Sequence, residues 1–225
     1  NASGAYVISA DIPSGMSGDG GVKLGTAVRA DKTVTIGELK TGFALGDGYD
    51  LCGAVVKKDI GICLNEGGYA CMYGDEDIAK LFPPRPRNSH KGTFGTATLI
   101  CGSRQYTGSA VLAVAAALRS GCGYVKAVCP DEVKAAIAPN YPQTVFSVQR
   151  DLSSRAIAIG MGCGASQSLH GDIESLLKEY SGTLIIDADG LNSLAQYGVE
   201  ILKNKKCGVV LTPHVKEFSR IWGRS

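Results

Sequence analysis

The sequence predicts an α/β protein made of two units, the second of which contains a mostly parallel sheet with helices on both faces. From residue 96 onward, short continuous apolar runs alternate with amphipathic stretches of helical period, as expected for buried parallel strands and their covering helices. Small and polar residues directly follow several of these runs. Because the carboxyl ends of parallel strands meet at one edge of a sheet, such residues are expected to face a ligand crevice.

The first unit is expected to contain little helix. Apolar runs predict strands over 6–10, 32–36 and 54–62, the first of them buried, and glycine-rich loops join these strands. One short helix is expected over 75–81. The run Phe82-Pro83-Pro84-Arg85-Pro86 then interrupts regular structure, because proline lacks an N–H donor and favours extended geometry in the residue before it. This predicts two domains, 1–82 and 83–225.

In the second unit, strands and helices alternate regularly. Strands are predicted over 96–101, 124–129, 156–160, 183–187 and 208–211, and helices over 109–120, 131–138, 168–180, 191–197 and from 215 onward. Right-handed crossovers place the carboxyl ends of all these strands at the same edge. The loops at that edge are therefore the candidate functional loops.

The composition argues against several classes of protein. Hydrophobic residues make up 44% and charged residues 20% of the chain, both ordinary globular values, and the longest apolar run, 110–118, is too short to span a bilayer. A net charge of +2, with the basic residues scattered among acidic ones, disfavours a nucleic-acid partner. The eight cysteines include no C-x-x-C pair, and Cys63 and Cys101 lie in apolar runs, which predicts mostly buried thiols in a reducing cytoplasm.

Two loops of the second unit combine glycines with the start of a helix or the end of a strand. Tyr106-Thr107-Gly108-Ser109-Ala110 opens a helix, so its backbone N–H groups suit a phosphate or a polar carbonyl group, although an ordinary N-cap has the same spacing. Gly160-Met161-Gly162-Cys163-Gly164 has glycines at alternate positions. This pattern indicates either a close backbone approach to a ligand or a tight turn.

Two further loops carry ionisable side chains. Asp187-Ala188-Asp189-Gly190-Leu191-Asn192 places two carboxylates and an amide at the end of a buried strand, where solvent, a cation or a ligand must compensate them; helix capping by Asp189 is the alternative. Thr212-Pro213-His214 ends the last predicted strand, and Glu217 follows three residues later. His214 is either a capping or packing residue or a ligand contact.

In the first unit, Asp11 follows a predicted strand and precedes Pro13, whose ring fixes the turn. Its carboxylate is therefore expected to be held at a strand end, where acid–base chemistry is possible. Ser14 and the glycines after it supply hydroxyl and carbonyl oxygens suited to an alkali cation or to water. The alternative is an Asx turn without a ligand.

Together, these motifs resemble the bifunctional NAD(P)H-hydrate repair enzyme family, which joins an NAD(P)H-hydrate epimerase to an ADP-dependent (S)-NAD(P)H-hydrate dehydratase of the ribokinase-like superfamily. Residues 11–15 and 30–35 are similar to the epimerase, whereas His90-Lys91-Gly92, 106–110, 187–192 and 212–214 are similar to the dehydratase. The run 90–95 is expected to face the same ligand crevice as 106–110. The resemblance implies the C-terminal part of a Rossmann-like epimerase domain, followed by the N-terminal part of a ribokinase-like α/β domain.

The resemblance also implies roles for particular residues. Asp11 would contact the hydrated cofactor as the catalytic residue of the epimerase, Ser14 would help to hold potassium, and Ala110, Gly162 and His214 would line the dehydratase pocket. The family phosphorylates the ring hydroxyl of the hydrate from ADP, or ATP, and then eliminates phosphate to restore NAD(P)H. Mg²⁺ and K⁺ are the implied metal cofactors. A cytoplasmic homo-oligomer that acts on NAD(P)H-hydrate, with neither nucleic acid nor membrane as partner, is expected.

The sequence departs from the family pattern in places. Met161 replaces the usual proline, and Val215-Lys216 replaces proline-glycine after His214. We expect an internal fragment, with the rest of the epimerase site before Asn1 and the dehydratase base beyond Ser225, and hence no dehydratase turnover by the fragment itself. Two alternatives are a ribokinase-like kinase of vitamin biosynthesis and a non-catalytic ligand-binding or scaffold protein.

Overall fold

A computed structural model describes residues 4–62, 70–82 and 84–223 of the chain. The chain divides into two compact units, Asn1–Pro84 and Arg85–Ser225. The assignment of an epimerase domain to 1–82 and a dehydratase domain to 83–225 stays a prediction. Cys63, predicted to be buried, lies outside the described residues. Among the helices of the described ranges, none has both the length and the apolar character needed to cross a membrane.

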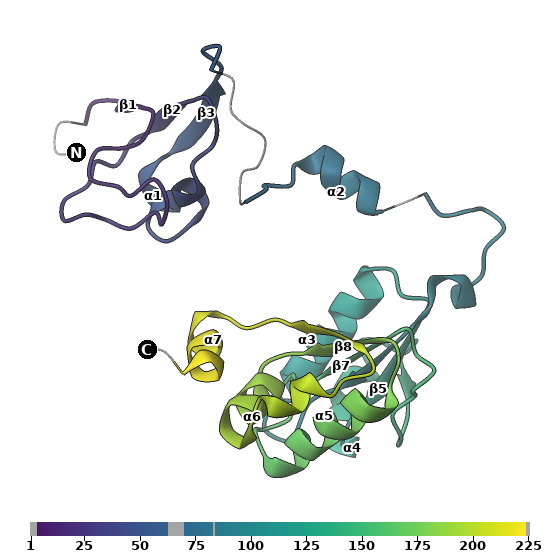
Figure 1. Ribbon diagram of the computed structural model, residues 1–225. Helices are drawn as coiled ribbons and strands as arrows, with labels where there is room; N and C mark the ends of the chain where they lie inside the picture. The colour runs from purple at the N-terminus through teal and green to yellow at the C-terminus, as the bar shows by residue number, and fades with distance from the viewer. Residues whose placement is uncertain (1–3, 63–69, 83, 224–225) are drawn as a thin grey trace. The chain divides into compact units, whose positions relative to one another are not determined.

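The first unit is built on a three-stranded parallel sheet with the strand order β1-β2-β3 (Figure 1). Its elements are β1 (Ile8–Ala10), β2 (Lys32–Ile36), the 3-10 helix η1 (Thr41–Ala44), α1 (Gly48–Leu51), β3 (Ala54–Lys58) and α2 (Asp75–Leu81). One sheet face packs on a small core that includes Phe43 and Leu51. β3 ends four residues before the end of the strand predicted over 54–62.

The prediction that the first strand is buried is wrong. β1 begins at Ile8, and the side chains of Tyr6 and Ile8 are 67% and 62% exposed. β1 is an edge strand, and its alternate residues point to opposite faces. Only Ser9, which pairs with the buried Thr33 of β2, lies on the face that packs against the core. An apolar run alone could not distinguish this one-sided edge strand from a strand covered on both faces.

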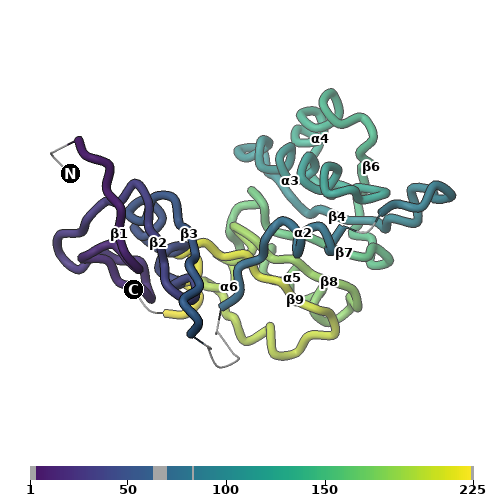
Figure 2. Tube along the Cα trace, turned by 90° about the horizontal axis from the view of Figure 1, so that it is seen from above, coloured from purple at the N-terminus to yellow at the C-terminus, as the bar shows by residue number. Residues whose placement is uncertain are grey.

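The second unit is a six-stranded parallel sheet with the order β6-β5-β4-β7-β8-β9. Its strands are β4 (Thr96–Ile100), β5 (Tyr124–Val128), β6 (Val145–Phe146), β7 (Ala156–Ile159), β8 (Thr183–Ile186) and β9 (Gly208–Leu211). Its helices are α3 (Thr107–Arg119), α4 (Asp131–Ile137), α5 (Gln167–Glu179), α6 (Asp189–Tyr197) and α7 (Val215–Trp222), with 3-10 helices η2 (Lys91–Phe94) and η3 (Glu200–Lys203). Helices α3 and α4 cover one face and α5 and α6 the other (Figure 2), which confirms the predicted fold class.

Apolar residues at helical spacing fix these helices to the sheet. Leu169, Ile173 and Leu176 of α5 recur every three or four residues and lie in one buried cluster with β7 and β8. Val114 of α3 and Ile137 of α4 lie in a second cluster on the opposite face, against β4 and β5. The two clusters make the sheet a rigid platform for the loops at its edges.

The chain enters the sheet in the middle and builds outward in both directions. β4 is followed by β5 and β6 on one side, and the chain then returns to β7 on the other side of β4 before it adds β8 and β9. The strand order therefore reverses between β4 and β7. In parallel α/β sheets, the carboxyl ends of the strands at such a switch point flank the ligand crevice.

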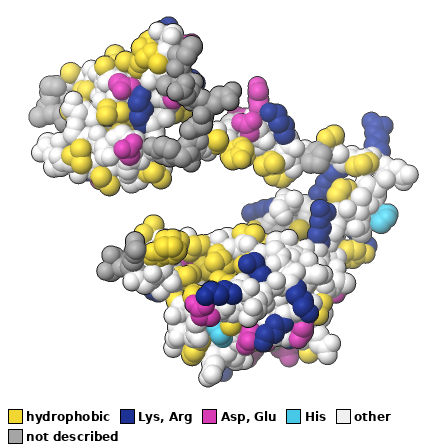
Figure 3. Space-filling model, in the orientation of Figure 1, with side chains coloured by type: hydrophobic (Ala, Val, Ile, Leu, Met, Phe, Trp, Pro, Cys, Tyr) yellow, Lys and Arg dark blue, Asp and Glu magenta, His cyan; other side chains and the backbone are white. Residues whose placement is uncertain are grey.

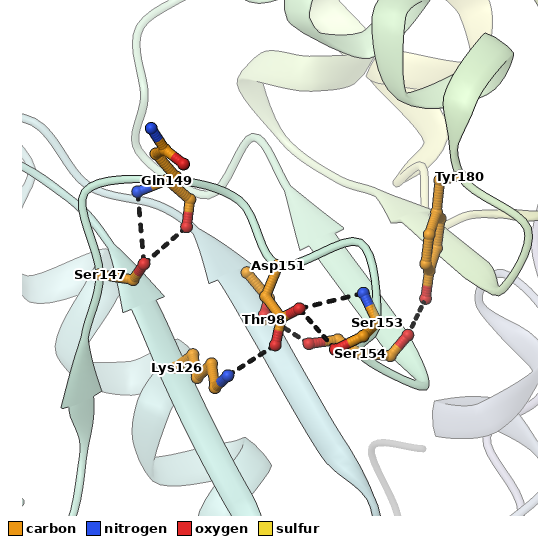
Figure 4. A network of polar contacts seen from close by, with 8 residues as sticks. All are labelled: Thr98, Lys126, Ser147, Gln149, Asp151, Ser153, Ser154 and Tyr180. Atoms are coloured by element: carbon orange, nitrogen blue, oxygen red, sulfur yellow. Dashed lines mark hydrogen bonds and ion pairs between the residues drawn. The ribbon is translucent and has the colours of Figure 1, made fainter.

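The connection from β6 to β7, residues 147–155, contains no helix and crosses β5 and β4 as a strap (Figure 4). Lys126 Nζ donates to Asp151 Oδ2 at 2.6 Å, and the hydroxyls of Thr98 and Ser154 lie 2.7 Å apart. Tyr180 donates its hydroxyl hydrogen to the Ser154 carbonyl oxygen at 2.8 Å. Buried polar groups are costly unless they are paired, so these hydrogen bonds hold the strap in place.

The kind of side chain exposed on the second unit differs between its two ends. Side chains of both charge signs are interspersed near α5, whereas hydrophobic side chains gather over α7 (Figure 3). On α7, Phe218 and Trp222 are 51% and 61% exposed, and their rings stack with centroids 5.8 Å apart. The last helix thus has one apolar side that faces solvent.

Candidate functional site

The loops after β4 and β7 meet at the switch point of the second sheet. Gly102 N donates to the carbonyl oxygen of Met161 at 2.8 Å, which ties one loop to the other. A Cβ atom at Gly162 would lie 2.8 Å from the Cβ atoms of Tyr106 and Ser109, and Gly162 has a φ of +69°. Only glycine satisfies both conditions. The Gly160–Gly164 loop therefore lies with its backbone directly against the start of α3.

Helix α3 presents its amino end at this switch point. The N-cap residue, Tyr106, makes no side-chain capping hydrogen bond. Within a helix, the first N–H groups have no intrahelical acceptor, and the helix dipole adds partial positive charge there. The start of this 13-residue helix is therefore suited to an anionic or strongly polar ligand group.

Ala110, which the family resemblance places in the pocket, is fully buried. It belongs to the core cluster of α3, α4, β4 and β5, and a Cβ atom at Gly102 would come within 2.9 Å of the Ala110 Cβ. The small side chain of Ala110 lets the loop after β4 lie against α3. Any contribution of Ala110 to a ligand site therefore comes from this packing and from the backbone, and its pocket role stays a prediction.

Asp189 ties the glycine loop to α6. Its Oδ2 accepts a hydrogen bond from Gly164 N at 2.8 Å, and its own N–H donates to the carbonyl oxygen of Gly160 at 3.2 Å. The alternative interpretation of Asp189 as the cap of α6 is wrong, because Ala188 is the N-cap residue. Ala188 has a φ of +49° and, with Asp11, is one of two non-glycine residues with positive φ in the described parts of the chain. Such backbone strain concentrates at functional sites.

His214 follows β9 at the same edge of the sheet. It is the N-cap of α7, and its Nδ1 accepts hydrogen bonds from Lys216 N at 3.1 Å and Glu217 N at 3.4 Å. The His214 side chain is nevertheless 62% exposed. β9 lies two strands from β7, which corresponds to roughly 10 Å at the usual strand spacing. His214 is thus a capping residue that stays open to a ligand spanning the edge.

His90-Lys91-Gly92 does not join these loops. This motif leads into η2, before β4, so it lies at the amino-terminal edge of the sheet. Gly123 N, just before β5, donates to the carbonyl oxygen of Gly95 at 3.1 Å, and Lys91 Nζ lies 4.6 Å from the centre of the Tyr124 ring. The expectation that this motif faces the same crevice as 106–110 is wrong. Its contacts are structural and secure the entry into the sheet.

In the first unit, Asp11 lies directly after β1 in a left-handed conformation, with a φ of +65°. Its Oδ1 accepts hydrogen bonds from Thr35 Oγ1 at 3.2 Å, Ile36 N at 2.9 Å and Lys40 Nζ at 2.5 Å. The Lys40 hydrogen bond is the largest of the effects that hold the pKa of the Asp11 carboxyl below its usual range. Asp11 is therefore an anion, anchored through one oxygen at the strand ends.

The role of Lys40 was not predicted from the sequence. The available signal was its position four residues after the end of β2, because the carboxyl ends of the parallel strands β1 and β2 share one edge. Lys40 Nζ also donates to Thr35 Oγ1 at 3.1 Å and to the Ile36 carbonyl oxygen at 2.8 Å. These bonds fix the ammonium group beside the carboxylate.

The predicted potassium residue, Ser14, is exposed, and within the described residues its hydroxyl makes no hydrogen bond. A hydroxyl and a nearby carboxylate are hard oxygen donors, which suits an alkali cation. The Ser14 hydroxyl and the Asp11 carboxylate would supply only some of the oxygen ligands that an alkali cation needs. In the described ranges, no group of three or more His, Cys, Asp or Glu side chains is arranged to hold a metal ion.

Comparison with known proteins adds an independent line of argument. A family model described as NAD(P)H-hydrate dehydratase matches residues 97–225, and one described as YjeF-related protein N-terminus matches residues 1–42. A bifunctional NAD(P)H-hydrate repair enzyme from Thermofilum pendens is 33% identical over 245 residues, covering 100% of this chain and 46% of that protein. The chain therefore spans about half the length of the curated relatives it matches.

Solved structures resemble the second unit. The ADP/ATP-dependent NAD(P)H-hydrate dehydratase from Bacillus subtilis, co-crystallised with ATP and Mg²⁺, superposes with a TM-score of 0.57 and 33% identity, over 66% of this chain and 54% of that one. A ribokinase-like superfamily protein from Enterococcus faecalis superposes with a TM-score of 0.57 at 24% identity, over 68% of this chain and 59% of that one. The second likeness concerns the fold alone, and it agrees with the ribokinase-like α/β architecture predicted from the sequence.

Proposed function

Because the chain belongs to the NAD(P)H-hydrate dehydratase family, we propose that its second unit binds (S)-NAD(P)H-hydrate at the carboxyl edge of the six-stranded sheet. The whole protein would use ADP or ATP to convert the hydrate to NAD(P)H, with release of phosphate and, from ADP, of AMP. The observation that carries this proposal is the meeting of the Gly162 loop with the start of α3 at the switch point, within the segment that matches the family.

The geometry supports a different role for each loop at the carboxyl edge of the sheet. The first N–H groups of α3, which have no intrahelical acceptor, suit a phosphate or another polar ligand group, and Gly162 lets its loop pack directly against this helix start. His214 offers an exposed imidazole from the end of β9. When bound, the nucleotide supplies the phosphoryl group that turns the ring hydroxyl into a leaving group. Such transfers depend mainly on positioning and on charge stabilisation, which loops and helix ends provide.

For the first unit, we propose a part in epimerising the R-hydrate, with Asp11 as the residue that contacts the hydrated cofactor. The support is its anchored, ionised carboxylate and the match of residues 1–42 to the YjeF-related family. Ser14 would contribute one oxygen to a potassium ion in the whole protein. Mg²⁺ would accompany the nucleotide. From the family resemblance, we also propose that the whole protein is a homo-oligomer. The seven cysteines of the described residues are free thiols, which supports a reducing, cytoplasmic location.

The decisive test is turnover by the whole protein with (S)-NADH hydrate, ADP and Mg²⁺. We expect the NADH absorbance to return as AMP and phosphate appear. Hydrate that stays unchanged with either ADP or ATP would contradict the proposal. A vitamin-precursor kinase would instead consume a hydroxymethyl pyrimidine or a thiazole, and a scaffold protein would bind ligand in a calorimeter without turnover.

The role of His214 is tested by substitution. His214→Ala removes the imidazole at the edge and is expected to weaken hydrate binding. Ser219→Ala is the matched control, because among the described residues the Ser219 hydroxyl bonds only to the Val215 carbonyl of its own helix. If the two variants have the same apparent affinity for the hydrate, His214 has a purely structural role.

A further inference from the structure

We infer that Glu217 is a positioning residue for His214, and that it helps to fix the imidazole as a hydrogen-bond donor through Nε2 rather than as a proton acceptor. The inference rests on the proposed function, because it specifies how His214 meets an acceptor oxygen of the hydrated cofactor. The sequence places Glu217 three residues after His214 but did not indicate a function for it.

The side chains of His214 and Glu217 both cap the start of α7, and each accepts a hydrogen bond from the other residue's backbone N–H. Nδ1 of His214 accepts from the backbone N–H groups of Lys216 and Glu217, at 3.1 and 3.4 Å. In return, Glu217 Oε2 accepts from the backbone N–H of His214 at 3.0 Å. This is a capping box in which the usual serine or threonine is replaced by histidine. It fixes the imidazole ring at the start of α7.

The capping box determines where the ring hydrogen lies. A nitrogen that accepts hydrogen bonds carries a lone pair, so the neutral imidazole of His214 must carry its hydrogen on Nε2. The opposite tautomer would point an N–H group at two backbone N–H groups. Nε2 lies 3.4 Å from Glu217 Oε1, so the carboxylate favours a hydrogen on that nitrogen. Both partners of the box thus select the same tautomer.

Burial separates the roles of the two side chains. The side chain of Glu217 is 9% exposed, whereas that of His214 is 62% exposed. Glu217 is therefore inaccessible to a large ligand and acts through the histidine. Helix α7 is further held by Arg220, whose Nη1 donates to Asn192 Oδ1 of α6 at 2.6 Å. The ring is consequently held on a fixed base, and most of the side chain stays open to solvent.

This arrangement has a chemical consequence. Because the lone pair of Nδ1 is used by the helix, His214 has no nitrogen available to remove a proton while the capping box is intact. Its available group is the Nε2–H, which can donate to a hydroxyl or phosphate oxygen of the hydrate. Preorganised donors of this kind stabilise charge without reorganisation.

The tautomer can be read from long-range ¹H–¹⁵N spectra of the chain, recorded without ligand at a pH at which the imidazoles are neutral. The sequence has three histidines, so a His214→Asn variant assigns the signal. We expect His214 to show the Nε2–H pattern in the wild type and in Glu217→Gln, whose amide oxygen can still accept from the His214 N–H. Glu217→Ala leaves both backbone donors but removes the carboxylate that holds the His214 N–H and lies beside Nε2, so the ring is held less firmly on these donors and a mixture of tautomers is expected. Ser219→Ala is the control on the same helix.

An Nδ1–H signal for His214 in the wild type would overturn the inference, whatever the variants do. Loss of the wild-type pattern in Glu217→Gln would also overturn it, as would an unchanged pattern in Glu217→Ala. Because these spectra need no hydrate, their outcome is independent of the proposed function. Hydrate titration is the second readout: His214→Asn keeps a good N-cap but replaces the imidazole Nε2–H by a shorter amide, and should weaken the affinity for the hydrate about three- to tenfold.

Discussion

Lys40 Nζ lies 2.5 Å from Asp11 Oδ1 and joins the end of one parallel strand to the segment that follows the next. Thr35 and Ile36 donate to the same carboxylate oxygen. Within the described residues, Oδ2 makes no hydrogen bond, so it is the oxygen left to meet a ligand. An Asp held in this way is an anionic acceptor at neutral pH.

Lys40→Met should therefore raise the pKa of the Asp11 carboxyl, because it removes the largest effect that lowers it. The acid limb of the pH profile for R-to-S epimerisation by the whole protein should move to higher pH. A ¹³C titration of the carboxyl group measures the same shift without substrate. Lys40→Arg keeps the charge and should keep a low pKa. An Asp11 titration identical in wild type and Lys40→Met would contradict this account.

Gly162→Ala tests the close approach of the glycine loop to α3. The new Cβ would meet Tyr106 and Ser109 Cβ atoms at 2.8 Å, in addition to the strain of a φ of +69°. Gly164→Ala is the matched control: its φ is +80°, yet no heavy atom lies within 4 Å of the new Cβ. Denaturant unfolding should show a loss of about 1 kcal/mol for Gly164→Ala and about 1–3 kcal/mol more for Gly162→Ala. Equal losses would mean that the loop does not press on the helix.

The strap over the sheet predicts a pH-dependent stability. Hydrogen bonds from Lys126 and Ser153 lower the pKa of Asp151 from its ordinary value of 3.8. A carboxyl with a depressed folded-state pKa stabilises the fold above its ordinary pKa, and this contribution is lost as the pH falls through the folded value. Asp151→Asn should cost about 1–3 kcal/mol at pH 7 in chemical unfolding.

The stability difference between wild type and Asp151→Asn should shrink as the pH falls below about 4, where the Asp151 carboxyl of the unfolded chain begins to bind a proton while that of the folded chain is still ionised. Glu174→Gln is a useful comparison, because the Glu174–Lys178 pair lies on an exposed helix surface and should contribute little. A constant difference for Asp151→Asn between pH 3 and pH 7 would argue against an ionised Asp151 in the strap.

Thiol labelling tests the burial pattern of the cysteines. Burial raises the pKa of Cys101 to about 12 and that of Cys163 to about 11, whereas Cys71 is exposed. Because the thiolate is the reactive form, a Cys63→Ser variant at pH 8 should be labelled first at Cys71 and only slowly at Cys101 and Cys163. Peptide mapping by mass spectrometry identifies the sites. Early labelling of Cys101 in the folded chain would show that its strand end is open.

Much of the second unit was predictable from the sequence, because its strands are continuous apolar runs and its helices have apolar residues at helical spacing. The predicted strand over 208–211 coincides with β9, and most other predicted boundaries differ by one or two residues. β6 was not predicted, because two residues are too short to form a pattern. The strap after it has no helical period, so the sequence did not show that it crosses the sheet.

The candidate site was predictable only in part. Spacing indicated that Gly162 and His214 follow parallel strands, which places them at one edge. It gave no sign that Ala110 points into the core, because this depends on how α3 packs on the sheet. The opposite position of 90–95 did have a signal, since this segment precedes the strand predicted over 96–101 and therefore lies at its amino end. The partners Lys40 and Glu217 were also missed as functional residues, since their roles arise from single hydrogen bonds to Asp11 and His214.

The proposed site predicts that the hydrated cofactor binds at the carboxyl edge of the six-stranded sheet. Titration of the ¹⁵N-labelled chain with (S)-NADH hydrate, followed in ¹H–¹⁵N correlation spectra, tests it most directly. Amide shifts should concentrate in 102–110, 160–164, 187–192 and 212–217, and leave 90–95 and 121–124 unchanged. Spectra that do not respond to the hydrate, or shifts confined to the opposite edge of the sheet, would contradict it.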